Sequence, residues 1–199
     1  MTDRILSTTP AHGRRLVALA GPPASGKSTL SLELADRLTT AGSSSVAVLM
    51  DGFHLDNRIL VSRGLLDRKG APETFDVRGV NRLVEALAEG GEVYYPLFDR
   101  AQDIAIAGAG VVLAECETVV VEGNYLLHDA EDRRDLVKWW DVSIRLVVPE
   151  PELEQRLMER WLAHGLTRGQ ARNRARRKDI TNARLVTQTA LEADVLVRL

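Results

Sequence analysis

The sequence is short of the features that mark secreted, membrane-embedded or nucleic-acid-binding proteins. Its 199 residues include one cysteine, Cys116, so no disulfide can form within the chain. We therefore expect a cytoplasmic protein in which Cys116 is a small buried residue. The formal net charge of -2 argues against nucleic acid as a partner, and no apolar run reaches the ~20 residues of a membrane-spanning helix. Its length suits one α/β domain over residues 1–199.

A phosphate-binding loop is the clearest motif that is present. Residues 21–28 read Gly-Pro-Pro-Ala-Ser-Gly-Lys-Ser, after an apolar segment typical of a buried strand and before a segment with helical periodicity. In such a loop the backbone N–H groups and the helix N-terminus bind phosphate oxygens. Lys27 would reach the β- and γ-phosphates of a nucleoside triphosphate, and the Ser28 hydroxyl would bind Mg²⁺. The predicted nucleotide-binding residues here are Gly21, Ala24, Ser25, Gly26, Lys27, Ser28 and Thr29.

Acidic residues follow two further strand-like segments. Asp51 comes after Ser45–Met50, and Glu122 lies at the end of the apolar run from Thr118. Because chemistry in open α/β sheets lies at the carboxyl ends of the strands, both acids should lie beside the phosphate loop. Asp51 could accept a proton from an attacking hydroxyl, or it could instead cap a helix that starts near Leu55. Glu122 could bind Mg²⁺ or orient the attacking group, or it could be a plain strand-end acid.

The remaining pattern predicts a doubly covered parallel sheet. Two more strands are expected at 142–148 and 194–197, with helices between the strands over 28–38, 77–88, 131–140 and 150–163. Asp76 should cap the second of these helices. We expect residues 1–14 to be frayed, and residues 104–110 and 111–114 to form a small hairpin.

Two stretches are candidates for function beyond nucleotide binding. The polar loops of residues 51–115 should bind the acceptor substrate. Each candidate there could also be an ordinary loop residue; besides Asp51, they are His54, Arg68, Lys69, Glu73, Asp99 and Arg100. Residues 160–178 are rich in arginine and predict a small helical lid over ATP, hinged at Gly165 and Gly169, in which Arg160 and Arg168 would contact ATP. A solvated surface is the alternative for this segment.

Taken in order, these motifs resemble the uridine kinase, phosphoribulokinase and bacterial pantothenate kinase group. The resemblance rests on residues 21–28, 51–54, 68–73, 96–100 and 119–123. It implies a P-loop NTPase three-layer sandwich with strand order 2-3-1-4-5. It also implies Mg²⁺-dependent transfer of the ATP γ-phosphoryl group to a hydroxyl of a small molecule, with Lys27, Asp51, Glu122 and Arg160 as catalytic residues. Ser28, Asp51 and Glu122 would then hold the metal.

Residues 68–73 and 182–186 resemble most closely a bacterial branch in which some members are labelled sugar kinases of fructose-uptake systems. That label suggests fructose as the acceptor. A uridine- or pantothenate-type acceptor is an alternative, although Asp51-Gly52-Phe53-His54 stands where uridine kinases usually have Asp-Ser-Phe-Tyr. A nucleotide-dependent switch or ATPase is a further alternative, and so is a nucleotide kinase acting on a phosphorylated acceptor, which the surplus of arginines would suit. The oligomeric state is expected to be monomer or homodimer.

Overall fold

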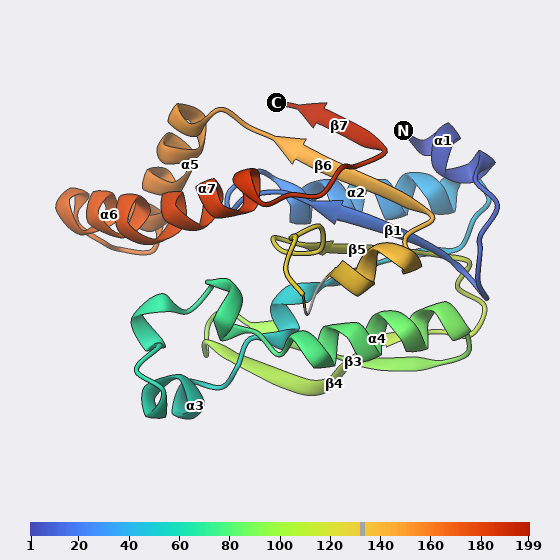
Figure 1. Ribbon diagram of the computed structural model, residues 1–199, viewed down its shortest axis with the longest axis horizontal. Coiled ribbons are helices and arrows are strands. Elements are labelled where there is room, and N and C mark those ends of the chain that lie inside the picture. Colours follow the sequence, from blue (N-terminus) through green and yellow to red (C-terminus); the bar gives the residue numbers. More distant parts are fainter. Residues whose placement is uncertain (132–133) are drawn as a thin grey trace.

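The computed structural model describes residues 1–131 and 134–199, and a parallel sheet forms its centre (Figure 1). The five strands of this sheet are β1 (Arg15–Ala20), β2 (Ser45–Leu49), β5 (Thr118–Gly123), β6 (Val142–Val147) and β7 (Val195–Arg198). Their order is β2-β5-β1-β6-β7, and each neighbouring pair is parallel. Counted among themselves along the chain, these strands have the order 2-3-1-4-5. The labels differ only because a separate hairpin, β3–β4, intervenes.

The central strands β1 and β5 are buried along almost their whole length because helices cover both faces of the sheet, and successive side chains point to opposite faces. In β1, Leu16 and Ala18 belong to one buried cluster and Val17 and Leu19 to another. The first cluster includes residues of α4 (Val77–Glu89), and the second includes residues of α1 (Thr2–Ser7) and α2 (Lys27–Thr40). The predicted three-layer α/β sandwich is therefore confirmed.

Several predicted helices are confirmed with small changes at their ends. Asp76 caps α4 by accepting a hydrogen bond from the Gly79 N–H at 2.9 Å. The segment expected to be helical from Glu131 contains η4 (Arg134–Trp139), a 3₁₀ helix, while residues 132 and 133 lie outside the described residues. The other helical elements are α3 (Asn57–Ser62), α5 (Glu150–Ala163), α6 (Arg168–Arg174), α7 (Ile180–Gln188), and the short turns η1 (Met50–Phe53), η2 (Leu66–Arg68) and η3 (Pro72–Thr74).

The expectation of a frayed N-terminus is wrong. Residues Thr2–Ser7 form α1, and Ile5 is buried within the cluster that also contains Leu34 and Leu38 of α2. Burying one large aliphatic side chain provides roughly 1.5–3 kcal/mol, which is enough to hold a short helix against the domain. Two adjacent apolar residues, Ile5 and Leu6, in a polar segment give too little periodicity to reveal this helix from sequence.

The hairpin predicted within residues 104–114 is also wrong. These residues form one strand, β4 (Ile104–Val112), which pairs antiparallel with β3 (Val93–Asp99). Pro96 lies where the pairing register shifts between Tyr95 and Leu97, as expected for a residue with no N–H to donate. The hairpin of β3 and β4 is thus a separate two-stranded sheet within residues 51–115.

The basic segment is more helical than predicted. Gly165 does end α5, with a positive φ of 81°, but Gly169 lies inside α6. Thr167 and Gln170 form a capping box at the start of α6, so Gly169 lies in the first turn of this helix and not at a break between helices. A π-helical turn, η5 (Ala175–Asp179), joins α6 directly to α7.

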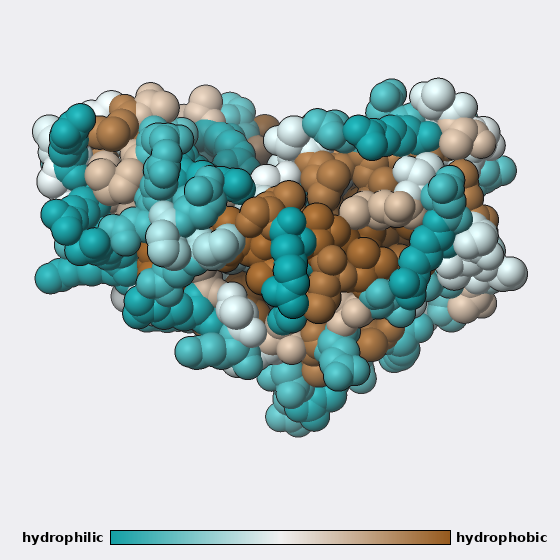
Figure 2. Space-filling model, turned by 90° about the horizontal axis from the view of Figure 1, so that it is seen from above, coloured by the Kyte–Doolittle hydropathy of each residue, from teal (hydrophilic) through white to brown (hydrophobic). Residues whose placement is uncertain are grey.

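Figure 2 shows the molecule from above the view of Figure 1, and β7 and β6 lie at that upper side. An apolar area occupies the middle of this face. Leu196 of β7 and the following Leu199 are exposed apolar residues of this part of the chain. Among the described helices, none is long and apolar enough to cross a membrane. The monomer or homodimer expectation stays a prediction.

Candidate active site

The phosphate loop has the conformation that its sequence predicts. Ala24 and Gly26 have positive φ angles of 60° and 86°, and α2 begins at Lys27 directly after them. The first N–H groups of a helix have no partner within the helix, so this end of α2 offers donors and a positive dipole to an anion. Among the described residues, the buried Ser25 hydroxyl has no hydrogen-bond partner, and the Lys27 Nζ donates to the Pro22 carbonyl oxygen at 3.1 Å. An anion could replace that carbonyl as the partner of Lys27.

Ser28 and Glu122 form a pair of oxygen groups beside this loop. The Ser28 hydroxyl donates to Glu122 Oε1 at 3.0 Å, although the residues are far apart in sequence. Register between β1 and β5 places Glu122 opposite Leu19, one residue from the end of β1, which brings the carboxylate to the loop. A hydroxyl and a carboxylate are the ligands that Mg²⁺ takes in phosphoryl-transfer sites, so these residues fit the predicted metal.

Burial shifts the pKa values of the two charged groups that face each other here. Glu122 and Lys27 are both buried. Desolvation raises the pKa of Glu122, opposed chiefly by the charge of Lys27. Desolvation likewise lowers the pKa of Lys27, opposed by Glu122 and Asp51. Each charge thus supports the other, as expected for a site built to receive phosphates and a metal ion.

Asp51 lies in η1, immediately beyond β2, with its carboxylate half-buried. It does not cap a helix: α3 begins at Asn57 and is capped by the Asp56 side chain. Arg100 donates from Nη2 to Asp51 Oδ2 at 2.9 Å. Asp51 also contributes to the electrostatic environment of Lys27 and Glu122. The structure therefore brings together Lys27, Asp51, Arg100 and Glu122, as the sequence predicts.

His54 lines the same part of the insertion through its ring. The ring lies between Phe75 and Phe98, at centroid distances of 4.1 and 4.7 Å. Its Nδ1 faces the Asp51 carbonyl oxygen at 2.7 Å, so Nδ1 carries the proton and donates. Burial lowers the pKa of His54, which favours the neutral ring with an acceptor at Nε2.

The cations of the acceptor loop have carboxylate partners within the insertion. Lys69 Nζ lies 2.9 Å from Asp103 Oδ1 and donates to Asn57 Oδ1 at 2.7 Å. Arg68 pairs with Glu73. Asp99 accepts hydrogen bonds from the backbone N–H groups of residues 101 and 102, so it shapes its own turn rather than reaching the other candidates.

Sequence reasoning missed the residues that anchor this loop. The Gly70 carbonyl oxygen accepts hydrogen bonds from Tyr125 Oη at 2.7 Å and from Asn182 Nδ2 at 3.2 Å. Tyr125 follows β5, and Asn182 lies in α7. Asn57 and Asp103 were missed as well. A polar residue directly after a strand could have drawn attention to Tyr125, but no local signal links Asn182 to Gly70.

The lid arginines divide into two groups. Arg160, on the last turn of α5, is half-buried and lies within electrostatic range of Lys27, Arg100 and Asp51. Arg168 is exposed at the start of α6, and in the described part of the chain no hydrogen bond or ion pair connects it to these residues. Its contact with ATP stays a prediction.

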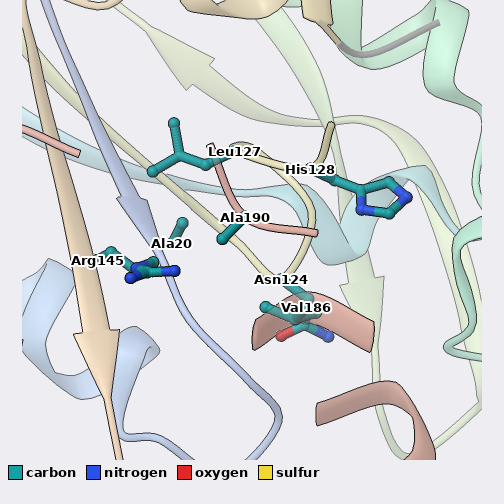
Figure 3. Close-up of a pocket in the computed structure, with 7 residues that line it drawn as sticks. All are labelled: Ala20, Asn124, Leu127, His128, Arg145, Val186 and Ala190. Atoms are coloured by element: carbon teal, nitrogen blue, oxygen red, sulfur yellow. The ribbon is translucent and has the colours of Figure 1, made fainter. Parts of the chain in front are cut away.

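A separate pocket lies beside the parallel sheet (Figure 3). Its lining comes from β1, β6, α7 and the loop after β5, and it includes none of Lys27, Asp51 and Glu122. The buried Arg145 Nε has no hydrogen-bond partner in the part of the chain that the structure describes, and the His128 ring turns away from Arg145 (Figure 3). This pocket is therefore separate from the residues that the sequence predicts for the site.

Comparison with known proteins points in the same direction. The model of the "Phosphoribulokinase / Uridine kinase family" matches residues 16–176. A solved Silicibacter protein described as a "putative fructose transport system kinase" is 54% identical, covers 98% of this chain and 96% of its own, and superimposes with a TM-score of 0.95. An uncharacterised Escherichia coli protein, YggC, is 35% identical over 98% of this chain and 81% of its own length. A Schizosaccharomyces pombe protein named a "putative uridine kinase" is 32% identical over 93% of this chain and 83% of its own length.

Proposed function

The chain belongs to the phosphoribulokinase and uridine kinase family, and we propose that it transfers the γ-phosphoryl group of ATP to a hydroxyl of an uncharged small molecule such as a sugar. The observation that carries this proposal is the position of Asp51. Its carboxylate follows β2 at the phosphate-loop edge of the sheet, half-buried beside Arg100. A carboxylate at that place can take a proton from an acceptor hydroxyl aimed at the γ-phosphorus.

The reaction we propose is an in-line displacement. The acceptor oxygen forms a bond to the γ-phosphorus while the bond from that phosphorus to the β–γ bridging oxygen breaks, and ADP leaves. Asp51 takes the hydroxyl proton, and Lys27 and Arg160 stabilise the charge on the transferring group. Ser28 and Glu122 would hold Mg²⁺, with Asp51 as the further predicted ligand. Bound with ATP, Mg²⁺ would neutralise phosphate charge.

The charge balance of the acceptor loop favours an uncharged acceptor. Lys69 and Arg100 each lie 2.9 Å from a carboxylate oxygen, and Arg68 is paired with Glu73. A phosphorylated acceptor would have to replace these carboxylates, whereas a polyol could bond to them and to the neutral His54 ring. The name of the Silicibacter relative supports fructose as the first sugar to test.

The test is ADP release from ATP and Mg²⁺ with a panel of fructose, other sugars, sugar phosphates, nucleosides and pantothenate. We expect one uncharged sugar to give turnover well above the rate without acceptor. Turnover with a sugar phosphate alone would contradict the uncharged acceptor but keep the kinase. Tight ATP binding without turnover on any acceptor would instead favour a nucleotide-dependent switch.

A further inference from the structure

An indole in the lid supports two arginines at once. Trp161 lies near the end of α5, and its Nε1 donates to Asp179 Oδ2 at 2.7 Å. The guanidinium carbon of Arg174 lies 4.0 Å from the centroid of the Trp161 ring, and that of Arg160 lies 5.4 Å away. Both are within the range of a cation–π interaction, which holds a guanidinium against an aromatic ring.

The two arginines need this support because they lie among other cations. Arg100 and Arg174 both lower the pKa of Arg160, after the larger effect of burial, while Asp179 and Asp51 raise it. Arg160 in turn lowers the pKa of Lys27. Like charges gathered around one site repel one another until phosphates arrive, so a fixed platform is needed to keep the arginines in place.

Asp179 is suited to fix that platform. It is buried, at 8% exposure, and it is the last residue of the π-helical turn η5. A π turn inserts an extra residue into a helix and so changes which side chains face inward. Here Asp179 and Ile180 are buried, while Arg176 and Arg177 of the same turn are exposed.

We propose that Asp179 is a positioning residue for ATP binding, which holds the Trp161 indole through its hydrogen bond so that the indole presents Arg160 and Arg174 to the phosphates. Asp179 itself does not touch the nucleotide. The inference rests on the proposed function, because it takes ATP as the ligand of these arginines.

The test is calorimetric titration with Mg²⁺ and a non-hydrolysable ATP analogue, which needs no acceptor. Trp161→Phe keeps a ring but removes the donor, and Asp179→Ala removes the acceptor. We expect each to raise the Kd about tenfold, as loss of a buried hydrogen bond to a charged group allows. Asp179→Asn, whose amide oxygen still accepts from the indole, should stay within about threefold of the parent chain. Arg176→Ala is the matched control, since Arg176 of the same turn pairs outward with Glu154 and should bind as the parent does.

The double variant separates a shared role from two independent ones. If Asp179 acts through Trp161, Asp179→Ala combined with Trp161→Phe should bind no more weakly than the poorer single variant. Losses that multiply to about a hundredfold would overturn the proposal. An affinity of Trp161→Phe equal to that of the parent chain would also overturn the proposal. Because Trp161→Phe keeps an aromatic ring, it tests the proposal even if Asp179→Ala does not fold. A parent chain that binds no nucleotide would overturn the proposed function together with this inference, whereas a binding parent with parent-like variants would overturn the inference alone.

Discussion

Replacing Asp51 by asparagine separates catalysis from folding. The carboxylate is half-buried and its partner Arg100 is 53% exposed on its side chain, so their ion pair is worth at most about 1 kcal/mol of folding free energy. Loss of a general base costs roughly 10²–10⁴ in rate, or about 3–5 kcal/mol of activation free energy. We therefore expect Asp51→Asn to lose at least about a hundredfold in kcat while its free energy of unfolding changes by less than about 1 kcal/mol.

The assay combines acceptor-dependent ADP release, calorimetric ATP binding and urea unfolding. ATP affinity should change little, since Lys27 and the phosphate loop remain. Asp103→Asn is the matched control: it removes the carboxylate that pairs with Lys69 and should raise the KM for the acceptor more than it lowers kcat. A kcat in Asp51→Asn within a few-fold of the parent would refute the assignment of the base. Loss of ATP binding together with folding would do so as well, because it would make the role of Asp51 structural.

Two further predictions use the same site. A Cβ on Gly52 would lie 2.0 Å from the Pro96 carbonyl oxygen, so Gly52→Ala must displace η1 from β3; we expect a loss of about 1–3 kcal/mol in unfolding free energy and most of the activity. Gly169→Ala is its control, since apart from its own helix turn no described residue has an atom within 4 Å of that Cβ in α6, and urea unfolding should show a gain of up to about 1 kcal/mol. The second prediction concerns the pH dependence of kcat and of kcat/KM for ATP. The proposed reaction uses the Glu122 carboxylate, whose pKa is raised, and the Lys27 ammonium, whose pKa is lowered. We therefore expect kcat/KM for ATP to fall as the pH drops through the pKa of Glu122 and as it rises through the pKa of Lys27. Bound Mg²⁺ and phosphates oppose both shifts, so the kcat profile should be the wider of the two; an equal or narrower kcat profile would contradict this account.

Local sequence signals were sufficient to place the candidate site residues that come directly after a buried strand. The phosphate loop, Asp51 and Glu122 could be placed because parallel strands end at one edge, and Asp76 could be assigned as a cap from its neighbours alone. The order of the strands came from the family resemblance rather than from the pattern. The pairing of β4 with β3 could not be predicted, because β4 carries alanine and glycine where a strand pattern would show alternating large residues.

The lid shows why charge counting alone cannot assign arginines. In the sequence, Arg168, Arg172 and Arg176 repeat every four residues, a spacing typical of one helix face. In the structure, Arg176 instead pairs with Glu154, and Arg174, which lies outside that repeat, stacks on Trp161. The π turn breaks the periodicity on which the sequence argument depends. The turn η5 and the helix α7 that follows it make two long-range contacts. Asp179 of η5 accepts a hydrogen bond from the Trp161 indole, and Asn182 of α7 donates one to the Gly70 carbonyl oxygen of the predicted acceptor loop. The continuous helical segment of η5 and α7 therefore contacts both Trp161 and the loop at Gly70, and a change in its register would displace both together.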